Sequence, residues 1–281
     1  MTLRTITDIY PALDTQDGAG VRLRRVLGQR PEQRMDPFLM MDHFASDKAD
    51  DYIAGFPDHP HRGFETITYM LDGHMMHRDH MGNEGHLRPG DVQWMTAGRG
   101  VIHSEMPQQE AGRMQGVQIW LNLPAALKMQ PACYRDIPAA KLPRIPLEEN
   151  GELVLLAGNL TLGGNTWQGP IHSNHTQPLI VDIHLSSGAQ LSLPVAQELN
   201  ALLYTFEGDI KVDKQTLPKG QSALLSPGDR LMLTADSHGG RVLLLAGRPL
   251  HEPVVQYGPF VMNTQVEIEQ AMMDYRTGKL V

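Results

Sequence analysis

The sequence of 281 residues contains a single cysteine, Cys133, and no long apolar run. One thiol cannot form an intramolecular disulfide, and the first residues lack the apolar core of a secretory signal, so we expect a cytoplasmic protein. Apolar stretches such as Leu153–Ala157 and Val242–Ala246 are too short to span a bilayer and are typical of buried strands. The sequence therefore argues against a disulfide scaffold and against a membrane-spanning helix.

Positive charge and helical periodicity are also scarce. The chain has 24 basic and 32 acidic residues, and its net charge of -8 would repel a phosphate backbone, so direct nucleic-acid binding is not expected. The densest basic stretch, Arg22–Arg30, falls in a predicted N-terminal strand and hairpin, which favours a solvated face. The 27 glycines and 20 prolines, with few helical periods, predict an all-β protein of short strands joined by tight turns.

Two pairs of polar residues carry the strongest functional signal. His59 and His61 are two residues apart, and so are His103 and Glu105, in segments that have strand character. Alternate side chains of a strand lie on one face, so each pair presents both members to the same side of a sheet. Imidazole and carboxylate ligands suit divalent iron, copper, manganese, nickel or zinc. The two pairs together predict one metal site.

Four further histidines, His74, His77, His80 and His86, form a cluster that could also suggest metal binding. Turn signals at Asp72-Gly73 and Gly82-Asn83 place the cluster in a hairpin at the mouth of a barrel. The irregular spacing of the histidines fixes no coordination geometry, so we do not assign a second metal site to them.

An internal repeat indicates two barrels of related construction. Gln190–Gly208 aligns without a gap on Gly55–Gly73, and after a five-residue deletion Leu217–Gly220 aligns on Leu87–Gly90. In this alignment each candidate ligand of the first copy meets a poor ligand in the second. The aligned pairs are His59 with Pro194, His61 with Ala196, Glu65 with Asn200, His103 with Leu233 and Glu105 with Ala235. We expect no metal in the second copy.

These patterns divide the chain into an N-terminal metal-binding barrel (residues 1–135), a proline-rich linker (136–146) and a second barrel with a C-terminal tail and helix (147–281). Thr264 and Glu267 form a predicted capping box for that helix, which Gly278 would end. Its apolar stripe would pack on a barrel, and the stripe consists of Val266, Ile268, Ala271, Met272 and Tyr275.

Apolar residues near the site are less informative. Met40, Met41, Phe44, Phe56, Met95 and Trp120 could line a pocket for an aromatic ligand. Methionine and aromatic residues inside a barrel are more often plain core, so none of them is assigned to substrate.

The motifs closely resemble those of the pirin family of bicupins over nearly the whole chain. The resemblance rests on His59–Glu65, His103–Glu105, Pro89–Gly100, Asp36–Phe44 and Gly247–Thr264, the last of which ordinary single-domain cupins lack. It implies an all-β bicupin, with two antiparallel jelly-roll barrels and a short C-terminal helix, that is a monomer.

The resemblance also implies the ligand set. Pirins hold one metal, usually Fe(II), on residues that match His59, His61, His103 and Glu105; Cu, Mn, Ni, Co and Zn are alternatives. Generic cupins instead use the glutamate that matches Glu65, and strand parity alone does not choose between the two carboxylates. The likeness to pirins selects Glu105 and leaves Glu65 as a supporting or structural group.

Two functions follow from the resemblance. The first is a quercetin 2,3-dioxygenase-like activity that uses O2 to open the heterocycle of a flavonol or related phenolic with loss of carbon monoxide, with Glu105 also accepting the flavonol proton. Four protein ligands leave about two positions of an octahedral ion open, which favours oxygen chemistry. The alternative is a non-enzymatic regulator of the transcriptional-cofactor type, whose metal redox state controls binding to a protein partner.

Overall fold

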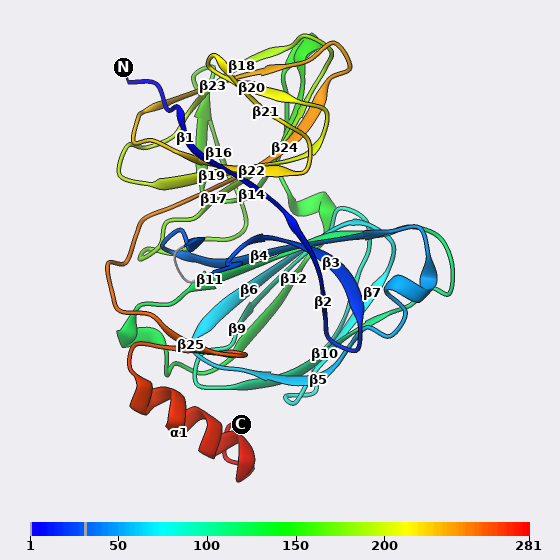
Figure 1. Cartoon of the computed structure of the whole chain (residues 1–281), viewed down its shortest axis with the longest axis vertical. Coiled ribbons are helices and arrows are strands. Elements are labelled where there is room, and N and C mark those ends of the chain that lie inside the picture. Colours follow the sequence, from blue (N-terminus) through cyan, green and yellow to red (C-terminus); the bar gives the residue numbers. More distant parts are fainter. Residues whose placement is uncertain (1, 31–32) are drawn as a thin grey trace. The chain divides into compact units, whose positions relative to one another are not determined.

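The computed structural model describes residues 2–30 and 33–281 and divides the chain into two compact units. We call the unit of Leu13–Arg34, Phe38–Ala139 and Leu250–Val281 the first barrel. The second barrel comprises the chain up to Ala12, Met35–Pro37 and Ala140–Pro249. Each barrel is built from a seven-stranded and a four-stranded antiparallel sheet (Figure 1). The all-β prediction is therefore confirmed.

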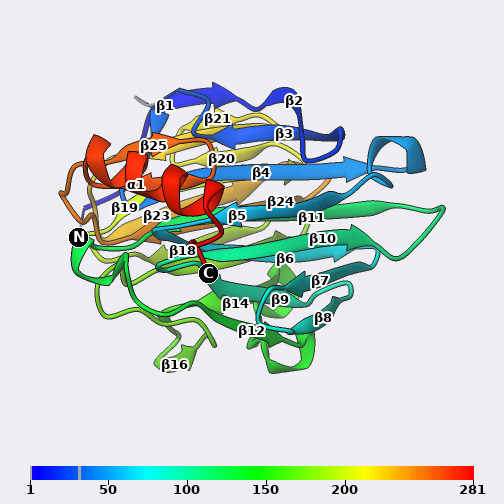
Figure 2. The same ribbon diagram turned by 90° about the horizontal axis from the view of Figure 1, so that it is seen from below.

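The first barrel contains the sheets that carry the candidate metal ligands. Its seven-stranded sheet runs in the order β12 (Cys133–Ile137), β9 (Val92–Thr96), β6 (Phe64–Asp72), β11 (Met114–Asn122), β4 (Phe38–Ser46), β3 (Val21–Leu27) and β2 (Leu13–Asp17). Its four-stranded sheet runs in the order β5 (Phe56–His61), β10 (Val101–Pro107), β7 (Met75–Asp79) and β8 (Glu84–Leu87). Figure 2 shows β5, β10, β7 and β8 with their labels.

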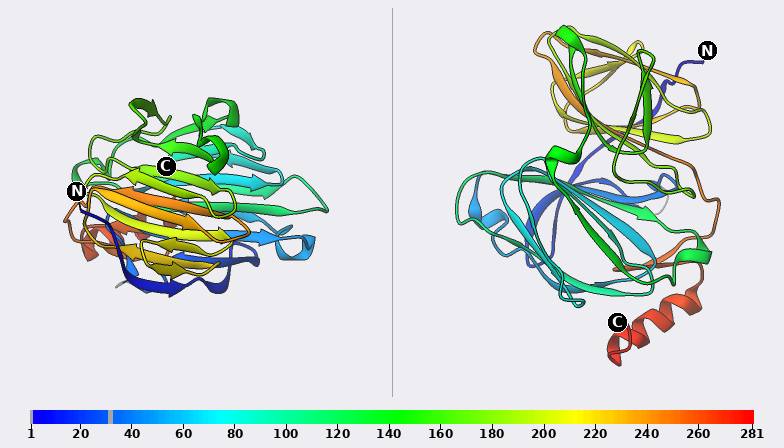
Figure 3. Two further views of the ribbon diagram at one scale, coloured as in Figure 1. Left: turned by 90° about the horizontal axis from the view of Figure 1, so that it is seen from above. Right: turned by 180° about the vertical axis from the view of Figure 1, so that it is seen from behind.

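The second barrel repeats this arrangement with other strands (Figure 3). Its larger sheet runs in the order β1 (Ile6–Pro11), β22 (Gln221–Leu225), β19 (Asn200–Glu207), β24 (Gly240–Gly247), β17 (Leu179–Leu185), β14 (Gly151–Ala157) and β13 (Arg144–Pro146). Its smaller sheet runs in the order β18 (Gln190–Pro194), β23 (Arg230–Ala235), β20 (Ile210–Val212) and β21 (Gln215–Leu217). A separate hairpin joins β15 (Asn159–Leu162) and β16 (Asn165–Gln168).

Strand pairing tests the repeat residue by residue. Tyr69 pairs with Val92 in the first barrel, and Tyr204 pairs with Ser222 in the second, as the aligned positions require. The alignment is wrong by three residues at β18, because Leu233 pairs with Leu191 where His103 pairs with His59. The residues that occupy the places of His59 and His61 are therefore Leu191 and Leu193, rather than Pro194 and Ala196. The expectation that the second copy lacks these ligands is unchanged, because leucine does not bind a metal ion.

Both ends of the chain are exchanged between the barrels. Strand β1 pairs with β22 at the edge where β12 pairs with β9 in the first barrel. Conversely, β25 (Val255–Tyr257), β26 (Phe260–Met262) and α1 (Gln265–Arg276) belong to the first barrel. Within the segment predicted as a linker, β12 ends at Ile137 and β13 pairs with β14. The division into residues 1–135, 136–146 and 147–281 stays a prediction. The structure adds that the segment up to Ala12 belongs to the second barrel and that Leu250–Val281 belongs to the first.

Lys128 and Gly63 fasten the C-terminal segment to the first barrel. The buried Lys128 ammonium donates to Gly63 O, Asn122 Oδ1 and Val261 O at 2.7, 2.6 and 3.1 Å. Gly63 has a φ of 91°, and a side chain there would overlap the carbonyl oxygen of Val261. Only glycine combines that backbone angle with so close an approach. The segment beside β26 is thereby held next to His61.

The helix α1 forms as its cap predicts. Thr264 accepts from the backbone N–H of Glu267, and the Glu267 side chain accepts from the Thr264 backbone N–H, which completes the capping box. Ile268 and Ala271 are buried, whereas Val266 is 73% exposed and Tyr275 is 43% exposed, so the predicted apolar stripe is too wide. No helix in the described ranges 2–30 and 33–281 is long and apolar enough to cross a membrane.

Candidate metal centre

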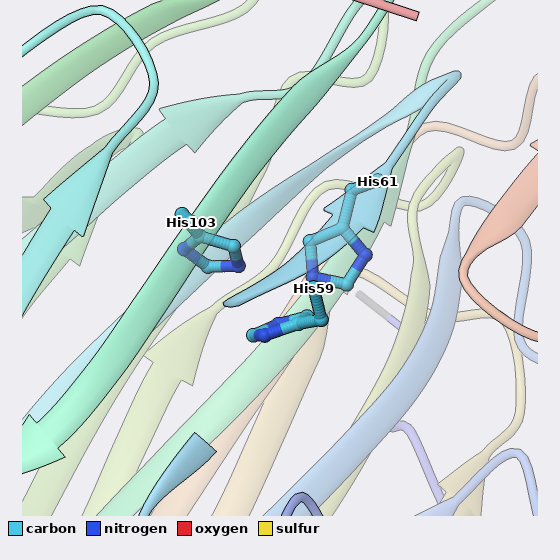
Figure 4. Close-up of side chains that lie close together, drawn as sticks. All are labelled: His59, His61 and His103. Carbon is cyan, nitrogen blue, oxygen red and sulfur yellow. The ribbon is translucent and has the colours of Figure 1, made fainter. Parts of the chain in front are cut away.

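Neighbouring strands bring three histidines together. Strands β5 and β10 are hydrogen-bonded neighbours, and His103 lies directly opposite His59 in their antiparallel register. His61 lies two residues further along β5 on the same face, so all three rings point toward one another (Figure 4). The ring centroids of His59 and His103 are 4.3 Å apart, and those of His61 and His103 are 5.0 Å apart.

The three histidines offer ring nitrogens that are close enough together to bind one metal ion. One potential ligand atom from each histidine lies within 4.8 Å of the others. His59 Nδ1 is 2.8 Å from Pro57 O, which makes it a donor and leaves Nε2 as the available ligand atom. Both ring nitrogens of His61 and Nε2 of His103 are buried without a hydrogen-bond partner in the described part of the chain. Because unpaired buried nitrogens are costly, these residues fit a resident ion.

Burial keeps two of the rings in the form that binds metals. Desolvation, together with the neighbouring histidines, lowers the pKa of His61 and of His103 well below the ordinary value. Both imidazoles are therefore neutral at neutral pH and need to lose no proton before they bind an ion.

Glu105 lies two residues beyond His103 on β10 and is buried. Gln118 Nε2 donates to both of its carboxylate oxygens, at 2.8 and 3.1 Å, and Thr68 Oγ1 donates at 3.3 Å. Trp120 Nε1 donates to Gln118 Oε1 at 3.3 Å, which fixes the orientation of the amide because an indole nitrogen is a donor only. The network holds Glu105 on the wall of the cavity that His59 and His61 also line.

Glu65 has a different environment. It lies on β6, where Thr96 Oγ1 donates to its Oε1 at 2.7 Å, and it is absent from the lining of that cavity. Desolvation by burial raises its pKa to about 7. Strand parity could not distinguish Glu105 from Glu65, but the structure does: Glu105 lines the cavity and Glu65 does not.

A cavity of about 650 Å³ opens beside the histidines, which is within the usual range for small-molecule sites. Four of the six residues named as pocket candidates line it, namely Met40, Phe44, Phe56 and Trp120. Met41 and Met95 are buried elsewhere in the core. Gln256, Gly258 and Pro259 complete the lining from the C-terminal segment, which sequence reasoning had not connected with the site.

A polar group in the cavity wall was also missed. Arg25 donates from Nε and from a terminal nitrogen to the two carboxylate oxygens of Asp42, at 2.9 and 2.8 Å, and contacts Asp17 at 3.3 Å. The Arg22–Arg30 stretch is therefore only partly a solvated face. Alternation along β3 directs Arg25 differently from its exposed neighbour Arg24, and that alternation is a signal present in the sequence.

The four-histidine cluster does not act as a unit. His74 Nε2 and His86 Nδ1 are 2.9 Å apart in a solvent-exposed pair, and His80 Nδ1 accepts from the Ile102 backbone N–H at 3.3 Å. His77, by contrast, is fully buried and lies behind His103, with the two Nδ1 atoms 3.3 Å apart. Its placement at the mouth of the barrel is therefore wrong.

Comparison with known proteins agrees with this fold. The model of the pirin family matches residues 20–121, and the model of the pirin C-terminal cupin domain matches residues 180–281. The chain belongs to the pirin family. It is 47% identical over 280 residues to a Pseudomonas aeruginosa protein named "putative quercetin 2,3-dioxygenase", covering 99% of this chain and 98% of that protein. The bicupin prediction is confirmed.

Two solved structures extend the comparison. The crystal structure of quercetin 2,3-dioxygenase from Acinetobacter baumannii aligns with a TM-score of 0.89 and 33% identity, covering 99% of this pirin and 98% of that chain. A bacterial pirin from Escherichia coli in complex with nickel(II) aligns with a TM-score of 0.66 and 19% identity, covering 86% and 99%. At that lower identity the second likeness shows the fold alone.

Proposed function

We propose that this pirin is a metal-dependent dioxygenase that opens the heterocycle of a flavonol such as quercetin with O2 and releases carbon monoxide. The observation that carries the proposal is the convergence of His59, His61 and His103 at one side of a cavity of about 650 Å³. The similarity to proteins named for quercetin 2,3-dioxygenase supports the substrate class.

In this proposal Glu105 is the fourth ligand, and the preferred ion is Fe(II). Glu105 lines the cavity with His59 and His61, whereas Glu65 is held by Thr96 away from it. Four protein donors of this kind would leave about two positions open on an octahedral ion, which would supply binding sites for oxygen ligands.

The other residues of the cavity suit a flat phenolic substrate. Met40, Phe44 and Trp120 offer apolar and aromatic surface, and the paired Arg25 and Asp42 offer polar groups for ring hydroxyls. Glu105 would accept the proton of the 3-hydroxyl, because its carboxylate lines the cavity in which the substrate would bind. Gln118 and Thr68 would keep it in place during that transfer.

The test is turnover by purified protein loaded separately with Fe(II), Cu, Mn, Ni, Co or Zn. We expect at least one form to bleach quercetin, to consume one O2 per flavonol and to release carbon monoxide. Glu105→Gln should lose turnover, while the exposed His172→Gln of the second barrel should retain it. Protein that holds about one ion per chain and turns over no flavonol in any form would overturn the enzymatic proposal and favour the regulatory alternative.

A further inference from the structure

His77 is fully buried, although it is not one of the proposed metal ligands. It lies on β7, which pairs with β10 so that His77 is opposite Glu105 and Asp79 is opposite His103. Its side chain is fully shielded from solvent, and its Nε2 has no hydrogen-bond partner among the described residues. A buried imidazole in this state is destabilising unless it serves another group.

Contact with the ring of His103 explains the position of His77. His77 Nδ1 lies 3.3 Å from His103 Nδ1, and both rings are buried. Of two neutral imidazole nitrogens in contact, one carries the hydrogen and the other accepts it. His103 can present Nε2 toward His59 and His61 only if its own hydrogen is on Nδ1. Nδ1 of His77 is then the acceptor, and the hydrogen of His77 is on Nε2.

Asp79 and Tyr134 hold His77 in that state. The Asp79 carboxylate is 4.0 Å from His77 Nε2 and is itself fixed by donors from Met81 and Asn83 at 2.8–3.1 Å. A negative charge on this side favours the tautomer with hydrogen on Nε2. The Tyr134 ring stacks on His77 with centroids 4.6 Å apart and an angle of 19° between the rings, which restricts rotation of the imidazole.

The second barrel has apolar residues at the positions of His77 and Asp79. Ile210 and Val212 pair with Ala235 and Leu233 there, so they occupy the places of His77 and Asp79. Ile210 and Val212 are buried in an apolar core. The fold itself therefore needs no histidine at this position, and the polar pair occurs in the barrel that carries the candidate ligands.

We propose that His77 is a positioning residue of the metal centre. Its Nδ1 accepts the Nδ1 hydrogen of His103, which fixes the ring of His103 with Nε2 directed at the ion, and Asp79 stabilises the required tautomer of His77. The inference rests on the proposed metal site but not on the flavonol reaction. Groups that orient a ligand in this way typically contribute about 10- to 100-fold in metal affinity.

The test measures Co(II) affinity of the full-length protein by competition with a chelator. His77→Ile, which installs the residue of the second barrel, should weaken Co(II) binding about 10- to 100-fold. His77→Asn should recover most of the affinity, because its side-chain oxygen can accept from His103 near the position of Nδ1. His86→Asn, from the exposed pair in the adjacent strand, is the matched control and should bind as the wild type does.

Proton NMR of the Co(II) protein separates this role from simple packing. The His103 Nδ1 hydrogen should give a shifted signal that exchanges slowly in the wild type and in His77→Asn, and rapidly in His77→Ile. Wild-type affinity and a slow signal in His77→Ile would overturn the proposal, and so would equal losses in the Ile and Asn variants. Co(II) binding with no flavonol turnover would contradict the proposed enzyme alone, whereas absence of Co(II) binding in the wild type would contradict the metal site itself.

Discussion

The β5–β10 pair of the first barrel and the β18–β23 pair of the second occupy matching places in the same strand order. Where the first pair holds three histidines, the second holds three buried leucines, Leu191, Leu193 and Leu233. The difference continues around the site, because Ala235 replaces Glu105, Leu244 replaces Gln118 and Ala246 replaces Trp120. These substitutes all belong to one apolar core.

The comparison shows which residues the fold requires and which it only accommodates. The second barrel forms the same sheets around leucine, so its core gains the full stabilisation of apolar burial, about 25 cal/mol for each Å². The first barrel forms around buried imidazoles, and both nitrogens of His61 and Nε2 of His103 have no hydrogen-bond partner among the described residues, which costs stability. Its interior is therefore arranged for a ligand, and exchanging residues between the barrels should separate binding from stability.

The largest effects are expected from exchanging His103 and Leu233. His103→Leu should reduce metal affinity by more than about 100-fold, since a ligand contributes more than the residue behind it, and should leave the metal-free protein at least as stable. Leu233→His would bury an unpartnered imidazole and should lower the free energy of unfolding by about 2–4 kcal/mol without adding a second ion. Elemental analysis and urea denaturation measure the two outcomes. A metal-free His103→Leu protein that is strongly destabilised would contradict the comparison.

A smaller effect should follow from weakening the contact between Gly63 and the C-terminal segment Leu250–Val281, which belongs to the first barrel only. Gly63→Ala would both strain a φ of 91° and overlap the oxygen of Val261, and should destabilise the protein by about 3 kcal/mol. Gly112→Ala is the matched control, because its φ is 93° and the nearest atom to an added side chain would be Gln109 Nε2 at 3.8 Å, so it should cost about 1 kcal/mol. Equal losses in chemical denaturation would mean that the contact with Val261 contributes nothing.

The third effect depends on pH and concerns Glu65, which occupies the place of Asn200 in the second barrel. Burial raises its pKa from 4.5 to about 7, so the folded protein binds the proton more tightly than the unfolded chain. The associated stability is fully present below pH 4.5 and is lost as the pH rises to about 7, by up to about 3 kcal/mol. Glu65→Gln should flatten this part of the profile and keep the metal affinity. Thermal unfolding between pH 5 and 8, run on both proteins, decides whether the slope belongs to Glu65.

Sequence alone was sufficient where local spacing determines geometry. The two-residue spacing of His59 and His61 puts both on one face of β5, and the capping box of Thr264 and Glu267 starts α1 where it was predicted. The repeat was also correct at Tyr69 and Tyr204. It failed at β18, where short strands without a shared motif allow a shift of three residues.

Contacts between distant segments were beyond such reasoning. The pairing of β1 with β22 joins residues more than two hundred positions apart, and no local pattern specifies that partner. The turn signals at Asp72-Gly73 and Gly82-Asn83 predict a hairpin at the mouth of the barrel for His77, whereas the structure buries its ring on β7 against His103. The environments of Glu105 and Glu65 differ through Gln118 and Thr96, which come from other strands.

The most direct test is a crystal structure of the metal-loaded protein with anomalous data at the edge of the bound metal. We predict one anomalous peak, in the first barrel, bound by His59, His61 and His103, with a Glu105 oxygen about 2.0–2.2 Å from the ion and Glu65 still bonded to Thr96. A peak inside the second barrel, or an ion bound by Glu65 with Glu105 turned away, would contradict the account.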